Sequence, residues 1–152
     1  MVQYPSGGYD KKALREYVVE MLQGKIKTLS YYLNFTLDAT REIKKTSKYD
    51  SIREEMQEEI YHLDKQMASL KLMQQNMRRV LSEPTEVVKV GSLVITQNSR
   101  FYISISLGEF FFDSLRYYAI SPESPMARLM LGKKPGESLV LGKIRQEIRE
   151  VY

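Results

Sequence analysis

The sequence contains no cysteine and no tryptophan, and only one of its 152 residues is a histidine. Without cysteine the chain can form neither a disulfide framework nor a thiolate metal site. With His62 alone, one chain can assemble neither a histidine-based metal cluster nor a Ser-His-Asp triad, and we expect that side chain on the surface. These absences exclude disulfide-rich scaffolds, structural zinc domains and triad hydrolases.

Long apolar runs are also missing, since no stretch approaches the roughly 20 residues that a membrane-spanning helix needs. Residues 1–9 lack the basic start and the apolar centre of a signal peptide, and we expect them to form a flexible tail. Together with the absence of cysteine, this predicts a cytoplasmic protein with no membrane partner.

Charge of one sign is not concentrated in any part of the chain, whose net charge is only +4. Residues 1–83 carry 14 Lys or Arg and 12 Asp or Glu, whereas residues 84–152 carry 9 and 7. Each half therefore has a net charge of +2, and neither is a dedicated nucleic-acid arm, in which basic residues would be concentrated.

Proline is absent from residues 10–82, and Gly24 is the one glycine in that stretch. Apolar residues instead recur three or four positions apart, the spacing that places a stripe on one face of a helix and forms the seam of a coiled coil. These positions are Leu14, Val18, Met21, Leu22, Ile26, Leu29, Leu33 and Leu37, then Ile52, Met56, Ile60, Leu63, Met67, Leu70, Met77 and Leu81. A stripe this long must be covered, so we predict an antiparallel coiled-coil hairpin over residues 10–83.

The turn of this hairpin is expected near residues 44–51, where the apolar spacing lapses. Ser47 with Asp50, and Ser51 with Glu54, each resemble a capping box that would start the second helix. Each arm would contain about 30–35 residues and measure on the order of 50 Å.

The composition changes at Pro84, after which short strand-like segments predominate. We predict strands over residues 86–95, 101–107, 138–141 and 144–152. Ser124 and Pro125 form an N-cap and first turn for one short helix over residues 126–131. The predicted fold class is therefore α+β, with a helical hairpin followed by a small β-sheet domain with one short helix over residues 84–152.

One segment of this second domain carries a family resemblance. Residues 119–137 read Ala-Ile-Ser-Pro-Glu-Ser-Pro-Met-Ala-Arg-Leu-Met-Leu-Gly-Lys-Lys-Pro-Gly-Glu. This stretch resembles the Gre transcript-cleavage factors of bacterial RNA polymerase, in which an Ile-Ser pair leads into Ser-Pro-x-Ala-Arg, Leu-x-Gly-Lys and Gly-Asp/Glu. Gly91 resembles the glycine that opens the family's first strand, and residues 107–109 resemble its Val-Gly-Glu turn.

The resemblance implies a fold and a partner. The second domain would be FKBP-like and would dock on RNA polymerase at the rim of the secondary channel. Its docking residues would be Gly108, Glu109, Ser124 and Pro125. The hairpin would enter the channel, where its tip could come close to nascent RNA or DNA. In the cleavage factors of this family, two acidic tip residues help to hold a metal ion and a water molecule for hydrolysis.

This sequence departs from the family at the tip, because Lys45 and Lys48 stand where the two acids should be. A charged lysine offers no lone pair to a cation and repels it. The basic tip residues are Arg41, Lys44, Lys45 and Lys48. We therefore expect a regulator of elongation that does not stimulate cleavage, with no catalytic residue, metal or cofactor of its own.

Three alternatives remain open from the sequence. The basic tip could be a solvated loop, as charge runs usually are. The chain could be a true cleavage factor whose acids, Glu42 and Asp50, sit in a shifted register. It could also be a chaperone-like protein-binding module with an FKBP-like domain. An Asp50–Glu54 carboxylate pair is better explained by helix capping.

Overall fold

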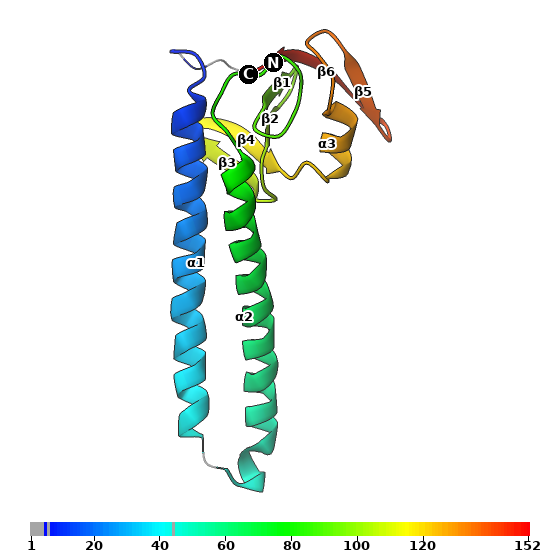
Figure 1. Cartoon of the computed structure of the whole chain (residues 1–152). Coiled ribbons are helices and arrows are strands. Elements are labelled where there is room, and N and C mark those ends of the chain that lie inside the picture. The colour runs from blue at the N-terminus through cyan, green and yellow to red at the C-terminus, as the bar shows by residue number, and fades with distance from the viewer. Residues whose placement is uncertain (1–4, 6, 44) are drawn as a thin grey trace. The chain divides into compact units, whose positions relative to one another are not determined.

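The computed structural model describes residue 5, residues 7–43 and residues 45–152 (Figure 1). Contacts within the chain divide it into two compact units. The hairpin unit comprises residues 19–74, and the sheet unit comprises residues up to 18 together with residues 75–152. Each unit is described on its own below.

Two long helices form most of the first half of the chain, as the apolar spacing predicts. Helix α1 spans Lys11–Glu42 and helix α2 spans Asp50–Asn76, with one 3-10 turn before α2 at Ser47–Tyr49 and another after it at Met77–Arg79. Asp10 starts α1, since its carboxylate accepts a 3.0 Å hydrogen bond from the Ala13 amide. Among the described residues, no helix is both long and apolar enough to cross a membrane.

Within the hairpin unit the two helices run antiparallel and bury a narrow seam (Figure 1). Leu22, Leu63 and Met67 are buried, whereas Ile52 at the far end of the predicted stripe is 46% exposed. Thr36 is also buried, and its hydroxyl donates to the Tyr32 carbonyl oxygen at 2.9 Å. Two helices alone cannot enclose both apolar stripes, so many side chains of the seam remain partly exposed to solvent.

Both predicted capping boxes are wrong. Ser47 begins the 3-10 turn, whose N-cap Thr46 makes no side-chain hydrogen bond, and Ser51 lies inside α2. Arg53 of α2 links the turn to this helix instead, because its guanidinium donates to the Asp50 carboxylate and to the Thr46 carbonyl oxygen. The turn is therefore tied to α2 by a cation.

The sheet unit contains a six-stranded mixed sheet and one short helix, which confirms the predicted α+β class. The strands are β1 Leu93–Thr96, β2 Arg100–Ile103, β3 Gly108–Phe112, β4 Leu115–Ile120, β5 Ser138–Leu141 and β6 Ile144–Val151. Their order is β3-β4-β2-β1-β6-β5, and among the pairings of the described residues only β2–β4 is parallel. Helix α3 spans Pro125–Met130 and contacts β5.

Three details of the strand prediction are wrong. The first strand begins at Leu93 rather than at residue 86, and the second ends at Ile103 rather than at residue 107. Residues 108 and 109 open β3 and do not form a turn. Val88, expected in the first strand, instead exchanges backbone hydrogen bonds of 2.9 Å with Gly132 and Lys133, in the loop after α3.

Side chains on the two faces of the sheet enter different packing layers, because neighbouring residues of a strand point to opposite faces. The layer that includes α3 is formed by Val88, Val94, Phe101, Ile103, Ala127, Met130, Leu139 and Ile148. On the opposite face, the Tyr17 ring of α1 lies 6.2 Å from the Phe110 ring and 5.1 Å from the Phe112 ring. The first turns of α1 therefore complete the core of the sheet unit.

Two cations hold these first turns in place. The Lys11 ammonium donates to the carbonyl oxygens of Glu83 at 2.7 Å and Tyr152 at 3.1 Å. The Arg15 guanidinium donates to those of Met77 at 2.8 Å and Val80 at 2.6 Å. Met77 begins the 3-10 turn that follows α2 and Val80 comes directly after it, so Arg15 ties the start of α1 to the chain that leaves α2.

Replacing Ser114 by glycine is expected to stabilise the protein by about 0.5–1 kcal/mol. Asp113 and Ser114 form the two-residue β3–β4 turn with φ of 52° and 62°, the left-handed pattern of a type I′ turn. Glycine adopts this conformation without the steric cost that serine bears. A higher urea midpoint, followed by far-UV circular dichroism, would show the gain.

The matched control is Ser106→Gly, at an exposed serine that does not have a positive φ. There glycine relieves no strain and only adds flexibility to the unfolded chain, so the midpoint should fall slightly. A lower midpoint for Ser114→Gly would contradict the strained-turn interpretation.

Candidate functional site

The turn between α1 and α2 presents exposed positive charge. Lys45 and Lys48 are both exposed, and the Lys48 ammonium lies 5.7 Å from the centre of the Tyr49 ring. Arg41, at the end of α1, forms a 3.4 Å ion pair with Asp38. Lys44 lies outside the described residues.

No carboxylate cluster suited to a metal ion is found at this turn in the described part of the chain. Asp50 is engaged by Arg53, an ion pair that reduces its availability as a metal ligand. Glu42 is exposed at the end of α1. In residues 5, 7–43 and 45–152, no group of three or more His, Asp or Glu side chains could hold a metal ion.

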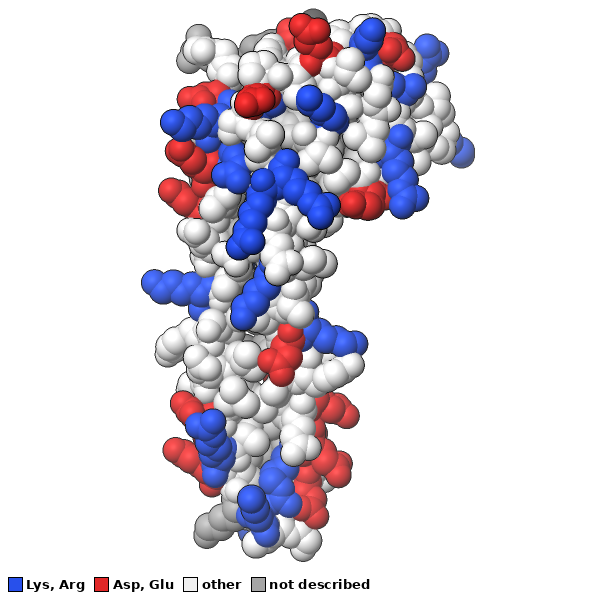
Figure 2. Space-filling view, in the orientation of Figure 1, with Lys and Arg blue, Asp and Glu red and all other residues white. Residues whose placement is uncertain are grey.

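The charge on the visible face is mixed (Figure 2). Lys and Arg side chains reach the end of the hairpin, and Asp and Glu side chains flank them along its sides. Such interspersed charge does not form a continuous basic stripe of the kind that tracks a nucleic-acid backbone. The exposed lysines of the turn therefore form only a small patch of positive charge at the end of the hairpin.

The four predicted docking residues lie around one end of β4. Gly108 opens β3 with φ of 76° and pairs with Ala119, and Glu109 follows it as an exposed residue. Because β3 and β4 are antiparallel, the start of β3 lies beside the end of β4. Ser124 and Pro125 then begin α3, shortly after β4 ends.

Ser124 has a defined structural task. Its hydroxyl oxygen accepts a 3.2 Å hydrogen bond from the Ala127 amide, and Pro125 occupies the first turn of the helix, both as predicted. Ala127 and Met130 of this helix are fully buried in the core. The Ser-Pro pair therefore fixes α3 on the sheet while Pro125 itself stays exposed.

One buried cation was missed by the sequence analysis. Arg100 is only 5% exposed, and its guanidinium donates to the Tyr9 hydroxyl at 2.9 Å and to the Arg116 carbonyl oxygen at 3.2 Å. It also lies over the Tyr117 ring, 5.6 Å from the ring centre. Nothing in the sequence predicts a buried side chain at Arg100, because no local pattern indicates the tyrosines that enclose it.

A comparison with solved structures finds five matching chains, including the two below. No protein-family model and no curated protein matches the chain. The structure of the transcription factor Gfh1 is similar with a TM-score of 0.35 and 21% identity, covering 87% of this chain and 90% of that chain. The crystal structure of GreA factor homolog 1 (Gfh1) of Thermus thermophilus gives a TM-score of 0.37 and 19% identity, covering 88% and 94%. These values are too low for a function to be transferred.

Proposed function

We propose that this protein is a Gre-like factor that binds RNA polymerase at the secondary channel and regulates elongation without stimulating transcript cleavage. The observation that carries the proposal is the Gre-like segment of residues 119–137. Its Ser-Pro pair begins α3 at the place where that resemblance expects it. A helical hairpin precedes this domain, in the order that the resemblance requires.

The docking surface of this proposal consists of Gly108, Glu109, Ser124 and Pro125. Glu109 supplies an exposed negative charge, and Pro125 supplies exposed apolar atoms on a rigid helix start. Rigid elements place such groups without an ordering cost on binding. A partner surface with a basic residue beside an apolar patch would complement them.

The hairpin end would act through charge rather than through metal binding. Lys45 and Lys48 are exposed and offer ammonium groups to RNA phosphate or to the acidic metal-binding centre of the polymerase. An ammonium group cannot recruit the hard cation that hydrolysis needs. The tip would then occupy the channel and alter elongation without supplying hydrolytic chemistry.

Reversing the charge of Glu109 should weaken binding to bacterial RNA polymerase about tenfold or more, because like charges then meet at the interface. The measurement is a titration of fluorescently labelled full-length chain with polymerase. Glu147→Lys is the matched control, since Glu147 is an exposed glutamate on β6, which three strands separate from β3 in the sheet. Equal affinities of the two variants would remove Glu109 from the docking surface.

Two Ser124 variants separate contact from capping. Ser124→Ala removes the cap of α3 and should cost about 1 kcal/mol of stability, whereas Ser124→Asp retains a good capping group. If the serine contacts the polymerase, both variants lose affinity. Full affinity of Ser124→Asp would limit this residue to its structural task.

The wild-type chain should produce no more transcript cleavage in halted elongation complexes than buffer does. It should nevertheless change the elongation rate, and Lys45→Glu with Lys48→Glu should reduce that change while binding persists. Cleavage that the wild type stimulates and Glu42→Gln with Asp50→Asn abolishes would instead establish the shifted-register cleavage factor.

A further inference from the structure

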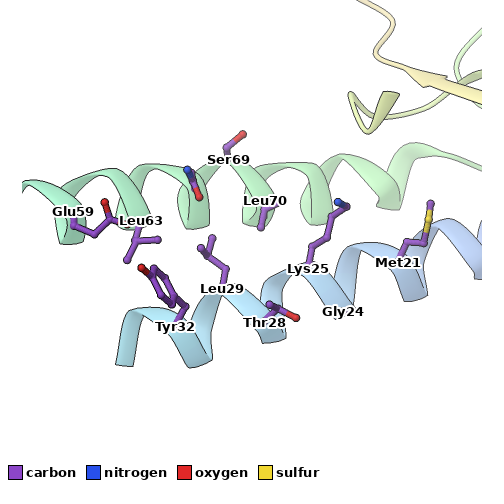
Figure 3. A pocket seen from close by; sticks show the side chains of 11 residues that line it. Met21, Gly24, Lys25, Thr28, Leu29, Tyr32, Glu59, Leu63, Ser69 and Leu70 are labelled. Atoms are coloured by element: carbon purple, nitrogen blue, oxygen red, sulfur yellow. The ribbon is translucent and has the colours of Figure 1, made fainter. Parts of the chain in front are cut away.

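An open groove of about 920 Å³ lies between α1 and α2, within the hairpin unit (Figure 3). Its apolar lining includes Leu29 and Tyr32 of α1 and Leu63 and Leu70 of α2. Figure 3 shows Glu59 and Tyr32 at one end, Lys25 towards the other end, and Leu29 between them. The groove therefore has an apolar floor with opposite charges at its two ends.

Small side chains create this groove. Gly24, Thr28 and Ser69 line it, and a Cβ atom at Gly24 would meet nothing within 4 Å. Packed helices normally fill the space between them with interdigitating side chains. Here that space is open to side chains from another molecule.

Aromatic side chains extend the apolar surface towards the turn. Tyr32 is 47% exposed and Phe35 is 62% exposed. Because residues three apart share one face of a helix, Phe35 continues the side on which Tyr32 lines the groove. Large aromatic side chains at this exposure favour an interface over a solvated surface.

The charges at the groove are arranged symmetrically. Lys25 lies four residues before Leu29, and Glu59 lies four residues before Leu63. Since the helices are antiparallel, the two offsets point in opposite directions and measure about 6 Å each. In the described part of the chain, neither Lys25 nor Glu59 forms an ion pair.

We propose that this groove binds the same groove of a second copy of the chain, with the two hairpins antiparallel around a two-fold axis. A two-fold contact repeats each interaction, so Lys25 of each copy would meet Glu59 of the other. The side of the hairpin unit that carries the groove extends beyond the groove itself, along residues 19–42 and 50–74, and measures about 35 Å by 20 Å. It would bury on the order of 1,400 Å² in total, within the range of stable interfaces.

Sedimentation equilibrium of the purified full-length chain tests the proposal, and no polymerase is present. The wild type should dimerise, and Lys25→Glu or Glu59→Lys alone should weaken the dimer about tenfold or more, because each places like charges together. The double variant should restore the dimer. Lys27→Glu, at an exposed lysine that does not line the groove, should leave the dimer unchanged.

A single cysteine provides an independent readout, since the chain has none of its own. Thr28→Cys lies in the groove beside the proposed axis and should form a disulfide between two copies under mild oxidation, whereas Lys27→Cys should not. Three results would overturn the proposal: a monomer at all concentrations, a dimer whose affinity neither charge reversal changes, or equal cross-linking of both cysteine variants. None of these outcomes bears on polymerase binding.

Discussion

Substituting Gly91 by alanine is expected to reduce the free energy of unfolding by about 2–4 kcal/mol, because backbone strain and a steric clash act together. Gly91 has φ of 95°, and a Cβ atom there would lie 2.9 Å from the carbonyl oxygen and 3.3 Å from the nitrogen of Leu81. Its amide donates a 2.8 Å hydrogen bond to the Ile103 carbonyl oxygen, so it cannot move away without breaking that bond. Urea unfolding followed by far-UV circular dichroism measures the loss.

Gly132→Ala is the control that isolates the conformational part of this loss. Gly132 has φ of 82°, yet a Cβ atom there would meet nothing within 4 Å. Its replacement should cost about 1–2 kcal/mol from the left-handed backbone alone. If Gly91→Ala costs no more than Gly132→Ala, the segment around Leu81 can shift and the steric argument is wrong.

The helices of the chain could be predicted from the sequence because their signals are local. Apolar residues three or four apart predict α1 and α2, and the Ser124-Pro125 pair predicts the start of α3. The same is true of the C-terminal hairpin, where strands over residues 138–141 and 144–152 were predicted within one residue. Each of these elements is specified by residues that lie close together in the sequence.

The β3–β4 hairpin could not be predicted because its signals are tertiary or atypical. Its turn uses Asp113 and Ser114, without the glycine that usually marks a type I′ turn. β4 is held by a parallel pairing with β2, from Phe101↔Tyr118 to Ile103↔Ile120, which no local pattern encodes. Residues 86–92 show the opposite error, a strand predicted where none forms. Their apolar residues alternate as in a strand but pack from a loop.

The residues of the candidate site could likewise be predicted only where their signal is local. Ser124 and Pro125 were recognised from a motif, and their helix-starting geometry follows from their chemistry. The groove of the hairpin was not recognised, because it results from small residues of two helices that face each other. Thr28 and Ser69 are 41 positions apart, and only the fold shows that both line one space.

Raising the pH from 8 to 10 is expected to stabilise the protein by about 1–2 kcal/mol, because one buried lysine then loses a charge that folding disfavours. Lys11 is 7% exposed, and burial, together with the charge of Lys89, lowers its pKa from 10.5 to about 8. Between these values the unfolded chain binds more protons than the folded chain, so the free energy of unfolding rises with pH. Urea titrations at intervals of half a pH unit measure the rise.

Above pH 10 the trend should reverse, which gives the stability curve a maximum near that pH. Burial raises the pKa of Tyr102 and of Tyr117 from 10.0 to about 12. Between these values the unfolded chain has already released phenolic protons that the folded chain retains, so the free energy of unfolding falls with pH. Lys11→Met removes the ammonium group and should flatten the rise between pH 8 and 10, while the fall above pH 10 persists. An unchanged rise in the Lys11→Met variant would mean that a group other than the Lys11 ammonium carries it.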